Sequence, residues 1–222
     1  MGKANGRKNL RYSIKLNEEQ VALTEEIRNN DITVVTGQAG SGKTLVAVMY
    51  ALDNLFQKEF DRIIITRPTV SKEEIGFLPG DIKEKLDPWL QPIYHNMNMC
   101  VYDSVEKKKH LDRRLENGDI EIAPISFMRG RTFLRSVVIV DEAQNLTHEQ
   151  MAMVVGRLGL HSKMIICGDS NQIDLLRKEH SGLGSFINLC KDIDGFYVKK
   201  LTKNHRHPIV SKILNKIETN KK

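Results

Sequence analysis

Short apolar runs, each ending in polar residues, recur along the chain. Six of them are interpreted as strands: Ile32–Thr36, Arg62–Pro68, Ile120–Pro124, Val137–Val140, Lys163–Cys167 and Phe196–Leu201. Apolar runs of this length that turn residues bound are typical of buried strands, and helical segments separate them. The alternation predicts an α/β protein with a mostly parallel sheet and helices on both faces.

Helical segments are expected before and between these strands. They are Asn17 to about Asn29, Leu45–Ala51, Ile82 to about Ser104, Glu106–Asn117 and a segment that carries Ser181–Gly184. Asn17 suits an N-cap, because its side chain can accept a hydrogen bond from a free N–H group of the first turn. Within the long helix we expect a break around Asp87-Pro88, since proline lacks a backbone donor, and before that helix a turn-rich loop at Gly76–Asp81.

The length and composition fit one globular domain. The chain has 222 residues, of which 40% are hydrophobic and 28% are charged. We expect a flexible basic arm at 1–12, a single domain at 13–215 and a basic tail at 216–222. No apolar run reaches the about 18 residues of a membrane span, and the N-terminus lacks the apolar segment of a secretory signal. These features predict a cytoplasmic protein.

Charge and cysteine content restrict the functional classes further. The formal net charge of +6 permits nucleic-acid binding without requiring it. Cys100, Cys167 and Cys190 stand far apart and form no C-x-x-C pair, so neither a disulfide framework nor a zinc site is predicted. We expect them to be buried thiols.

The motif with the most specific chemistry follows the first strand. Residues 37–44 fit the phosphate-binding loop pattern G-x-x-x-x-G-K-[ST] without a mismatch, between a strand and a helix as the pattern requires. They are Gly37, Gln38, Ala39, Gly40, Ser41, Gly42, Lys43 and Thr44. The glycines let backbone N–H groups and the helix N-terminus surround a polyphosphate. We therefore expect nucleotide binding, with Lys43 on the β- and γ-phosphates and the Thr44 hydroxyl on Mg²⁺.

Two carboxylates follow the fourth strand. Val137–Val140 runs directly into Asp141 and Glu142, and the carboxyl ends of parallel strands meet at one edge of a sheet. Both acids should therefore lie beside the phosphate-binding loop. Asp141 is expected to bind Mg²⁺, directly or through water, and Glu142 to orient and deprotonate the water that attacks the γ-phosphate. An acidic pair alone is weak evidence, but the loop upstream makes a Walker B motif the better interpretation.

Polar residues also follow the last two strands. Asp169 and Gln172 come after the fifth strand, and Gln172 is the expected sensor of the γ-phosphate or of the attacking water. After the sixth strand, Arg206 can supply a guanidinium that stabilises charge on the transferring phosphoryl group. His205 and His207 flank Arg206 without a third ligand for a metal.

Other polar residues each have an ordinary alternative. Gln20 lies upstream of the loop, and its amide could pair with adenine N6 and N7, although a surface glutamine on a helix has the same sequence signature. Thr66 and Arg67 end the second strand and should face the same edge of the sheet, where Arg67 could contact a nucleic-acid backbone. Arg129 and Arg131 flank a glycine and could approach phosphates, or could belong to a solvated loop.

Together these motifs resemble the PhoH family of P-loop ATPases. The resemblance is carried by Gly37–Thr44, Thr66–Pro68, Met128–Thr132, Val140–Asn145, Gly168-Asp169 and Arg206–Pro208, and it extends from about residue 14 to 215. PhoH-like proteins are similar to the first RecA-like domain of superfamily 1 helicases. This similarity implies a RecA-like P-loop fold and adenine recognition by Gln20. It also implies nucleic-acid contacts at Thr66, Arg67, Arg129 and Arg131. Leu201–Arg206 fits the helicase L-x-x-N-x-R segment, which implies that Arg206 reaches the γ-phosphate.

The implied function is Mg²⁺-dependent ATP hydrolysis coupled to RNA or single-stranded DNA. Helicases have a second RecA-like domain that completes the ATP site, and this chain ends 16 residues after Arg206. We therefore expect neighbouring subunits to supply that wall in a homo-oligomeric ring, which the similarity implies to be hexameric and which could act as a helicase. Arg206 could then act in its own site or across a subunit boundary.

Two other functions fit parts of the pattern. A nucleotide-gated regulatory or binding module would hydrolyse slowly to switch a partner-binding surface, and its turnover would not respond to a polynucleotide. A small-molecule kinase would need an acceptor site or an Arg-rich lid, and neither is apparent in the sequence.

Overall fold

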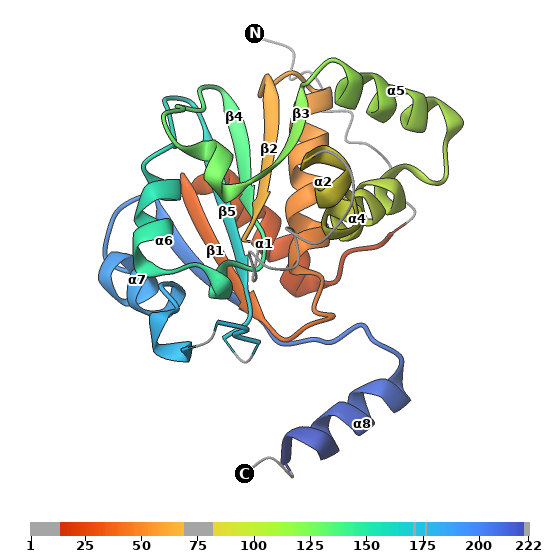
Figure 1. Cartoon of the computed structure of the whole chain (residues 1–222). Helices are drawn as coiled ribbons and strands as arrows, with labels where there is room; N and C mark the ends of the chain where they lie inside the picture. The colour runs from red at the N-terminus through yellow and green to blue at the C-terminus, as the bar shows by residue number, and fades with distance from the viewer. Residues whose placement is uncertain (1–13, 69–81, 171, 176, 220–222) are drawn as a thin grey trace, which may run out of the picture.

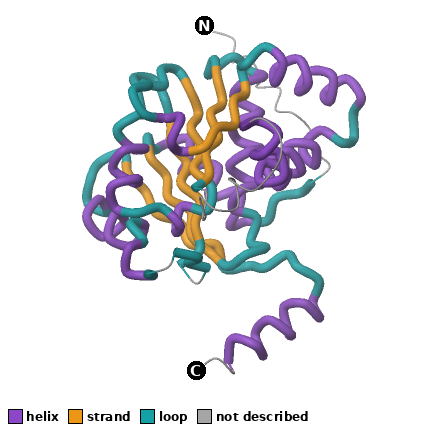
Figure 2. The backbone as a smooth tube through the Cα atoms, viewed as in Figure 1, coloured by secondary structure: helices purple, strands orange, loops and turns teal. Residues whose placement is uncertain are grey.

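The computed structural model describes residues 14–68, 82–170, 172–175 and 177–219. Six parallel strands form one sheet in the order β3-β2-β4-β5-β1-β6 (Figures 1 and 2). They are β1 (Ile32–Gly37), β2 (Arg62–Arg67), β3 (Ile120–Pro124), β4 (Ser136–Val140), β5 (Lys163–Gly168) and β6 (Phe196–Leu201). All neighbouring strands pair in parallel, so their carboxyl ends lie along one edge. The predicted strands and the α/β fold class with a parallel sheet are confirmed.

Helices cover both faces of the sheet. One face carries α1 (Glu18–Asn29), α2 (Lys43–Phe56), α4 (Ile82–Val101) and α5 (Val105–Glu116), and the other carries α6 (His148–Val155) and α7 (Leu183–Cys190). Short 3₁₀ helices are η1 (Ile125–Met128), η2 (Ala143–Asn145) and η3 (Lys178–His180). The last helix, α8 (Pro208–Thr219), extends away from the sheet (Figure 1). Within the described ranges, no helix has the length and apolarity needed to cross a bilayer.

Strand side chains alternate between two apolar clusters, one on each side of the sheet. Val35, Ile65 and Ile139 pack under the helices α1, α2 and α4, whereas their neighbours Val34 and Ile64 pack on the side of α6 and η1. Burial of the central strands β1, β2, β4 and β5 explains the near-continuous apolar runs in the sequence. The polar residues that end each run are left at the carboxyl edge, where the site lies.

The N-cap prediction is confirmed, and the prediction of a helix break is wrong. The Asn17 side chain accepts a hydrogen bond from the backbone N–H of Gln20 at the start of α1. The helix α4 runs through Asp87 and Pro88 without interruption and ends at Val101. An interior proline costs about 3 kcal/mol. The buried apolar side chains of α4 that follow it, among them Ile93 and Met97, offset this cost.

The remaining sequence predictions concern segments and thiols. The loop at 76–81 and the arm at 1–12 lie outside the described residues. The first residues of the predicted basic tail, 216–219, belong to α8. All three cysteines are free: Cys100 and Cys167 are buried, and Cys190 is half-buried.

Candidate functional site

The loop between β1 and α2 has a backbone that only glycine adopts readily. Gly40 and Gly42 have positive φ angles of 87° and 85°. A Cβ atom on Gly42 would come within 2.5 Å of Gln20 Nε2, and one on Gly40 within 2.7 Å of Arg206 Cγ. The N-cap residue of α2 is Gly42 itself, which offers no side chain to the free N–H groups of the first turn. These groups therefore remain available to an anion.

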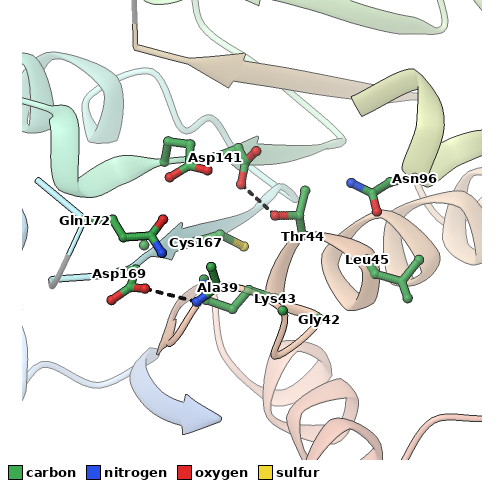
Figure 3. A pocket seen from close by; sticks show the side chains of 13 residues that line it. Ala39, Gly42, Lys43, Thr44, Leu45, Asn96, Asp141, Cys167, Asp169 and Gln172 are labelled. Carbon is green, nitrogen blue, oxygen red and sulfur yellow. Dashed lines mark hydrogen bonds between the residues drawn. The ribbon is translucent and has the colours of Figure 1, made fainter. Parts of the chain in front are cut away.

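The loop borders a pocket at the carboxyl ends of β1, β4 and β5 (Figure 3). Its cavity measures about 230 Å³. Besides the loop residues, its lining includes Asp141 and Glu142 after β4, Asp169 and Gln172 after β5, and Asn96 from α4. The strand β5 lies between β1 and β4 in the sheet, so three successive strand ends contribute to a single site. The structure thus brings Asp141, Glu142 and Gln172 beside the phosphate-binding loop, and it adds Asn96, which was not predicted.

Lys43 and Thr44, at the start of α2, face polar groups of the pocket. Lys43 Nζ donates hydrogen bonds to the carbonyl oxygens of Gly37, at 2.6 Å, and Gln38, at 3.2 Å. The Thr44 hydroxyl donates to Asp141 Oδ1 at 2.7 Å, and Figure 3 shows the two side chains turned toward each other. A hydroxyl and a carboxylate are hard oxygen donors of the kind that Mg²⁺ prefers, so this pair could hold the ion.

Asp141 is buried in the floor of the pocket. Burial raises the pKa of its carboxyl group, and the hydrogen bond from Thr44 opposes that shift. A bound cation would favour the ionised carboxylate, so protons and a cation would compete at this residue.

Glu142 is held in a fixed position by its backbone and by two side chains. Its φ angle of 52° and ψ of 39° are left-handed, a conformation that non-glycine residues rarely adopt and that clusters at functional sites. Its Oε1 lies 3.7 Å from Arg67 Nη2, and its Oε2 accepts a 2.6 Å hydrogen bond from Gln144 Nε2. Contacts on both oxygens therefore fix the orientation of the Glu142 carboxylate, which was predicted to be a general base.

Gln144 was not predicted to have a role, and it connects the site. It is completely buried. Its Oε1 accepts from the backbone N–H of Asp169 at 2.9 Å, and its Nε2 donates to Glu142 and to the carbonyl of Gln172. Asp169 Oδ2 in turn accepts from the backbone N–H of Ala39 at 3.1 Å. This chain of hydrogen bonds links the phosphate-binding loop to Glu142. A polar residue two positions after the acidic pair Asp141-Glu142 was the available sequence signal.

Gln172, the predicted sensor, lies in the pocket lining near Asp169 (Figure 3). Its backbone N–H donates to the Asp169 carbonyl at 2.9 Å, and its own carbonyl accepts from Gln144 at 3.1 Å. The backbone is thus anchored, and the side chain is exposed to the pocket.

Gln20 lies against the phosphate-binding loop. Its Nε2 donates to the carbonyl of Ser41 at 3.1 Å, and its Oε1 accepts from the backbone N–H of Asn17 at 3.0 Å. Both ends of the amide are used within the protein, so pairing with adenine would require these bonds to be exchanged. In this structure Gln20 supports the loop and caps α1.

Arg206 reaches the phosphate-binding loop of its own chain. The backbone N–H of His205 donates to the Gly40 carbonyl at 2.9 Å, and Asn204 Nδ2 donates to the Ala39 carbonyl at 3.4 Å. The Arg206 side chain lies beside Gly40 and is exposed. The segment after β6 is therefore tied to the loop that was predicted to bind phosphate.

The four residues predicted to contact nucleic acid lie in different surroundings. Thr66 is completely buried, and Arg67 is half-buried beside Glu142. Arg129 is exposed. Arg131 forms a two-pronged ion pair with Glu121, at 2.5 and 2.6 Å, and its guanidinium stacks on the Phe133 ring. Arg67 is thus partly exposed to solvent beside Glu142, and Arg129 is exposed.

The ion pair between Arg131 and Glu121 is expected to stabilise the folded state in a pH-dependent way. Hydrogen bonding from Arg131 lowers the pKa of Glu121 below its ordinary 4.5, so the pair stabilises the folded state above that pH and loses this effect as the pH falls through the lowered pKa. We expect Glu121→Gln to reduce the free energy of unfolding by about 0.5–1 kcal/mol at neutral pH and by less in acid. Urea unfolding at both pH values measures this, and an equal loss at both would contradict it.

Comparisons with known proteins found similar solved structures and similar curated sequences. In solved structures, the chain resembles Bacteroides Pif1 bound to ssDNA (19% identity, 92% of this chain and 46% of that one, TM-score 0.45) and Pif1 helicase from Candida albicans (14%, 91% and 43%, TM-score 0.47).

Curated relatives are more similar in sequence. A PhoH-like protein of Bacillus subtilis is 44% identical over 210 residues, covering 93% of this chain and 63% of the relative. One of Synechocystis is 44% identical over 195 residues, covering 86% and 58%. The chain thus spans about 60% of the length of these relatives. The family model described as PhoH-like protein matches residues 14–218. The chain therefore belongs to the PhoH-like protein family.

Proposed function

We propose that this protein is a Mg²⁺-dependent ATPase whose hydrolysis is coupled to binding of RNA or single-stranded DNA. The observation that carries the proposal is the meeting of Lys43, Thr44, Asp141 and Glu142 in one pocket at the carboxyl edge of the sheet. An ammonium, a helix N-terminus, a pair of hard oxygen ligands and a carboxylate base are the groups that phosphoryl transfer to water requires.

Each of these residues has a role in the proposed reaction. The N-terminus of α2 and Lys43 bind the phosphates, and Lys43 exchanges its bonds to the loop carbonyls for phosphate oxygens. Thr44 and Asp141 would hold Mg²⁺, which supplies positive charge to the phosphate oxygens. Glu142 accepts a proton from water as the water oxygen bonds to the γ-phosphorus and the bond to ADP breaks.

Three further residues complete the proposed ATP site. Gln172 senses the γ-phosphate or the attacking water, and Arg206 stabilises charge on the transferring group, in its own site or in that of a neighbour. Gln20 reads adenine if its present bonds are exchanged. Its contact with the loop carbonyl of Ser41 would make loop geometry depend on the bound base.

The nucleic-acid part of the proposal rests on charge and position. Arg67 ends β2 and Arg129 follows η1 after β3, and these strands are neighbours in the sheet. Both residues therefore lie near the carboxyl edge that holds the pocket. The net charge of +6 favours association with a polyanion.

We also propose that the protein works as a homo-oligomer, and a hexameric ring would supply a second wall to each pocket. Support comes from α8, which extends from the sheet (Figure 1) with Ile209, Val210 and Ile213 exposed by 54%, 39% and 51%. Apolar residues on one helix are typical of a surface that a partner covers.

Steady-state ATP hydrolysis with poly(rU) and poly(dT), titrated separately, tests the coupling. We expect one polymer to raise the turnover rate, because a polymer that binds beside the pocket can change the positions of the side chains that line the pocket. Glu142→Gln, prepared in the same way, controls for contaminating ATPases. A rate that neither polymer changes would contradict the coupling.

A turnover rate that neither polymer changes would favour a nucleotide-gated regulatory module. The specific observation in its favour is the hydrogen-bonded chain from Ala39 through Asp169 and Gln144 to Glu142, which could transmit nucleotide state to a surface without motor activity.

A further inference from the structure

An ion pair joins the proposed general base to a residue at the end of a neighbouring strand. Arg67 ends β2 and Glu142 follows β4, and these strands pair directly. The backbone N–H of Asp141 donates to the Thr66 carbonyl at 2.8 Å, which fixes the two strand ends side by side. Arg67 Nη2 lies 3.7 Å from Glu142 Oε1, and the side chains are 22% and 34% exposed. The pair is thus within reach of solvent and of a ligand.

Both oxygens of the Glu142 carboxylate are engaged in this arrangement. Oε2 accepts from Gln144, whose own position is fixed by its bond to the backbone of Asp169. Oε1 faces the guanidinium of Arg67. A general base needs a free lone pair within hydrogen-bond reach of the attacking water. An oxygen that faces a guanidinium is less available for that role.

We propose that Arg67 is a positioning residue that restrains Glu142, and that phosphates of RNA or single-stranded DNA relieve this restraint by pairing with Arg67. The inference rests on the proposed function, and it names the residue through which the polymer acts on hydrolysis. The bond from Gln144 keeps Glu142 directed into the pocket while Oε1 becomes free for water.

The chemistry of the Arg67 guanidinium favours the exchange of Glu142 for a phosphate of the polymer. Arginine pairs with phosphate through two parallel N–H groups, which is a stronger contact than one N–O distance of 3.7 Å to a carboxylate. The Arg67 side chain is partly exposed, so a backbone phosphate can approach it without unfolding the strand end. A bound polymer would therefore compete with Glu142 for this side chain.

Arg67→Gln removes the charge and keeps most of the side-chain length. We expect its turnover rate without polymer to rise about two- to fivefold, the factor that corresponds to a partly exposed ion pair. We also expect the added stimulation by poly(rU) or poly(dT) to be lost, because the restraint is already absent. Arg67→Lys keeps the charge and should retain part of the restraint and part of the stimulation.

Two controls separate this effect from damage to the site. Arg28→Ala removes a surface arginine that pairs with Glu25 on α1, at the opposite edge of the sheet, and should leave both rates unchanged. The dissociation constant of a fluorescent ATP analogue, measured with Arg67→Gln, should equal the wild-type value, since Arg67 restrains Glu142 and does not bind the phosphates of ATP.

The outcomes distinguish the inference from the function on which it rests. A wild-type rate that no polymer changes contradicts the proposed coupling. A stimulated wild type, together with Arg67 variants whose rate without polymer is at or below the wild-type value, overturns the inference alone. An elevated rate in Arg67→Gln with the stimulation lost supports both.

Discussion

Glu142→Gln is expected to stop hydrolysis while ATP still binds. The amide cannot accept a proton from the attacking water, so we expect the turnover rate to fall by about 10²–10⁴-fold. Its oxygen can still accept the hydrogen bond that Gln144 donates, so the pocket should keep its shape. Steady-state hydrolysis gives the rate, and a fluorescent ATP analogue gives the dissociation constant, which we expect to stay within a few-fold of the wild-type value.

A matched substitution distinguishes this effect from the loss of any surface carboxylate. Glu149 lies exposed in the first turn of α6, and Glu149→Gln should leave both the rate and the affinity unchanged. A Glu142→Gln rate within a few-fold of the wild type would show that another group takes the proton.

Lys43→Ala is expected to remove most of the affinity for ATP. Hydrogen bonds to charged groups contribute about 1.5–3 kcal/mol each, so the dissociation constant should rise by about 10- to 150-fold. The turnover rate should fall as well, since the same ammonium neutralises charge on the phosphates that leave. Titration with a fluorescent ATP analogue, followed by a hydrolysis assay, measures both effects.

Lys163 provides the control for this substitution. Its Nζ donates to the Asn30 carbonyl at 2.7 Å, a contact of the same kind as that of Lys43 with the loop, but at the amino end of β5. Lys163→Ala should therefore lose a comparable bond without changing nucleotide affinity. Equal affinities of the Lys43→Ala and wild-type proteins would show that nucleotide binds elsewhere.

The sheet and the centre of the site could be predicted because local sequence determines them. Strands that are covered on both faces consist mostly of apolar residues, so the sequence shows them as apolar runs. In a parallel sheet, the residues after Val140 and Cys167 then fall at the edge where the loop after β1 lies. Lys43, Asp141 and Gln172 each follow a strand that ends at this edge. They therefore lie in one pocket although they are far apart in the sequence.

What the sequence could not predict depends on contacts between distant residues. Thr66 is completely buried at the end of β2 whereas Arg67 is half-buried, and no local pattern distinguishes the two residues. Arg131 pairs with Glu121 because the chain folds back after η1, and Gln144 acquires its role from the turn that follows β5. The helix break predicted at Pro88 from local propensity is also absent, since tertiary packing of α4 outweighs the local cost of proline.

The most direct test of the proposed chemistry is steady-state ATP hydrolysis by the purified wild-type protein, measured with Mg²⁺ and with excess EDTA, in the presence and absence of RNA and single-stranded DNA. We predict turnover that requires Mg²⁺ and that one of the polymers increases. The absence of turnover under every one of these conditions would contradict the assignment of the Lys43, Thr44, Asp141 and Glu142 pocket as a site of ATP hydrolysis.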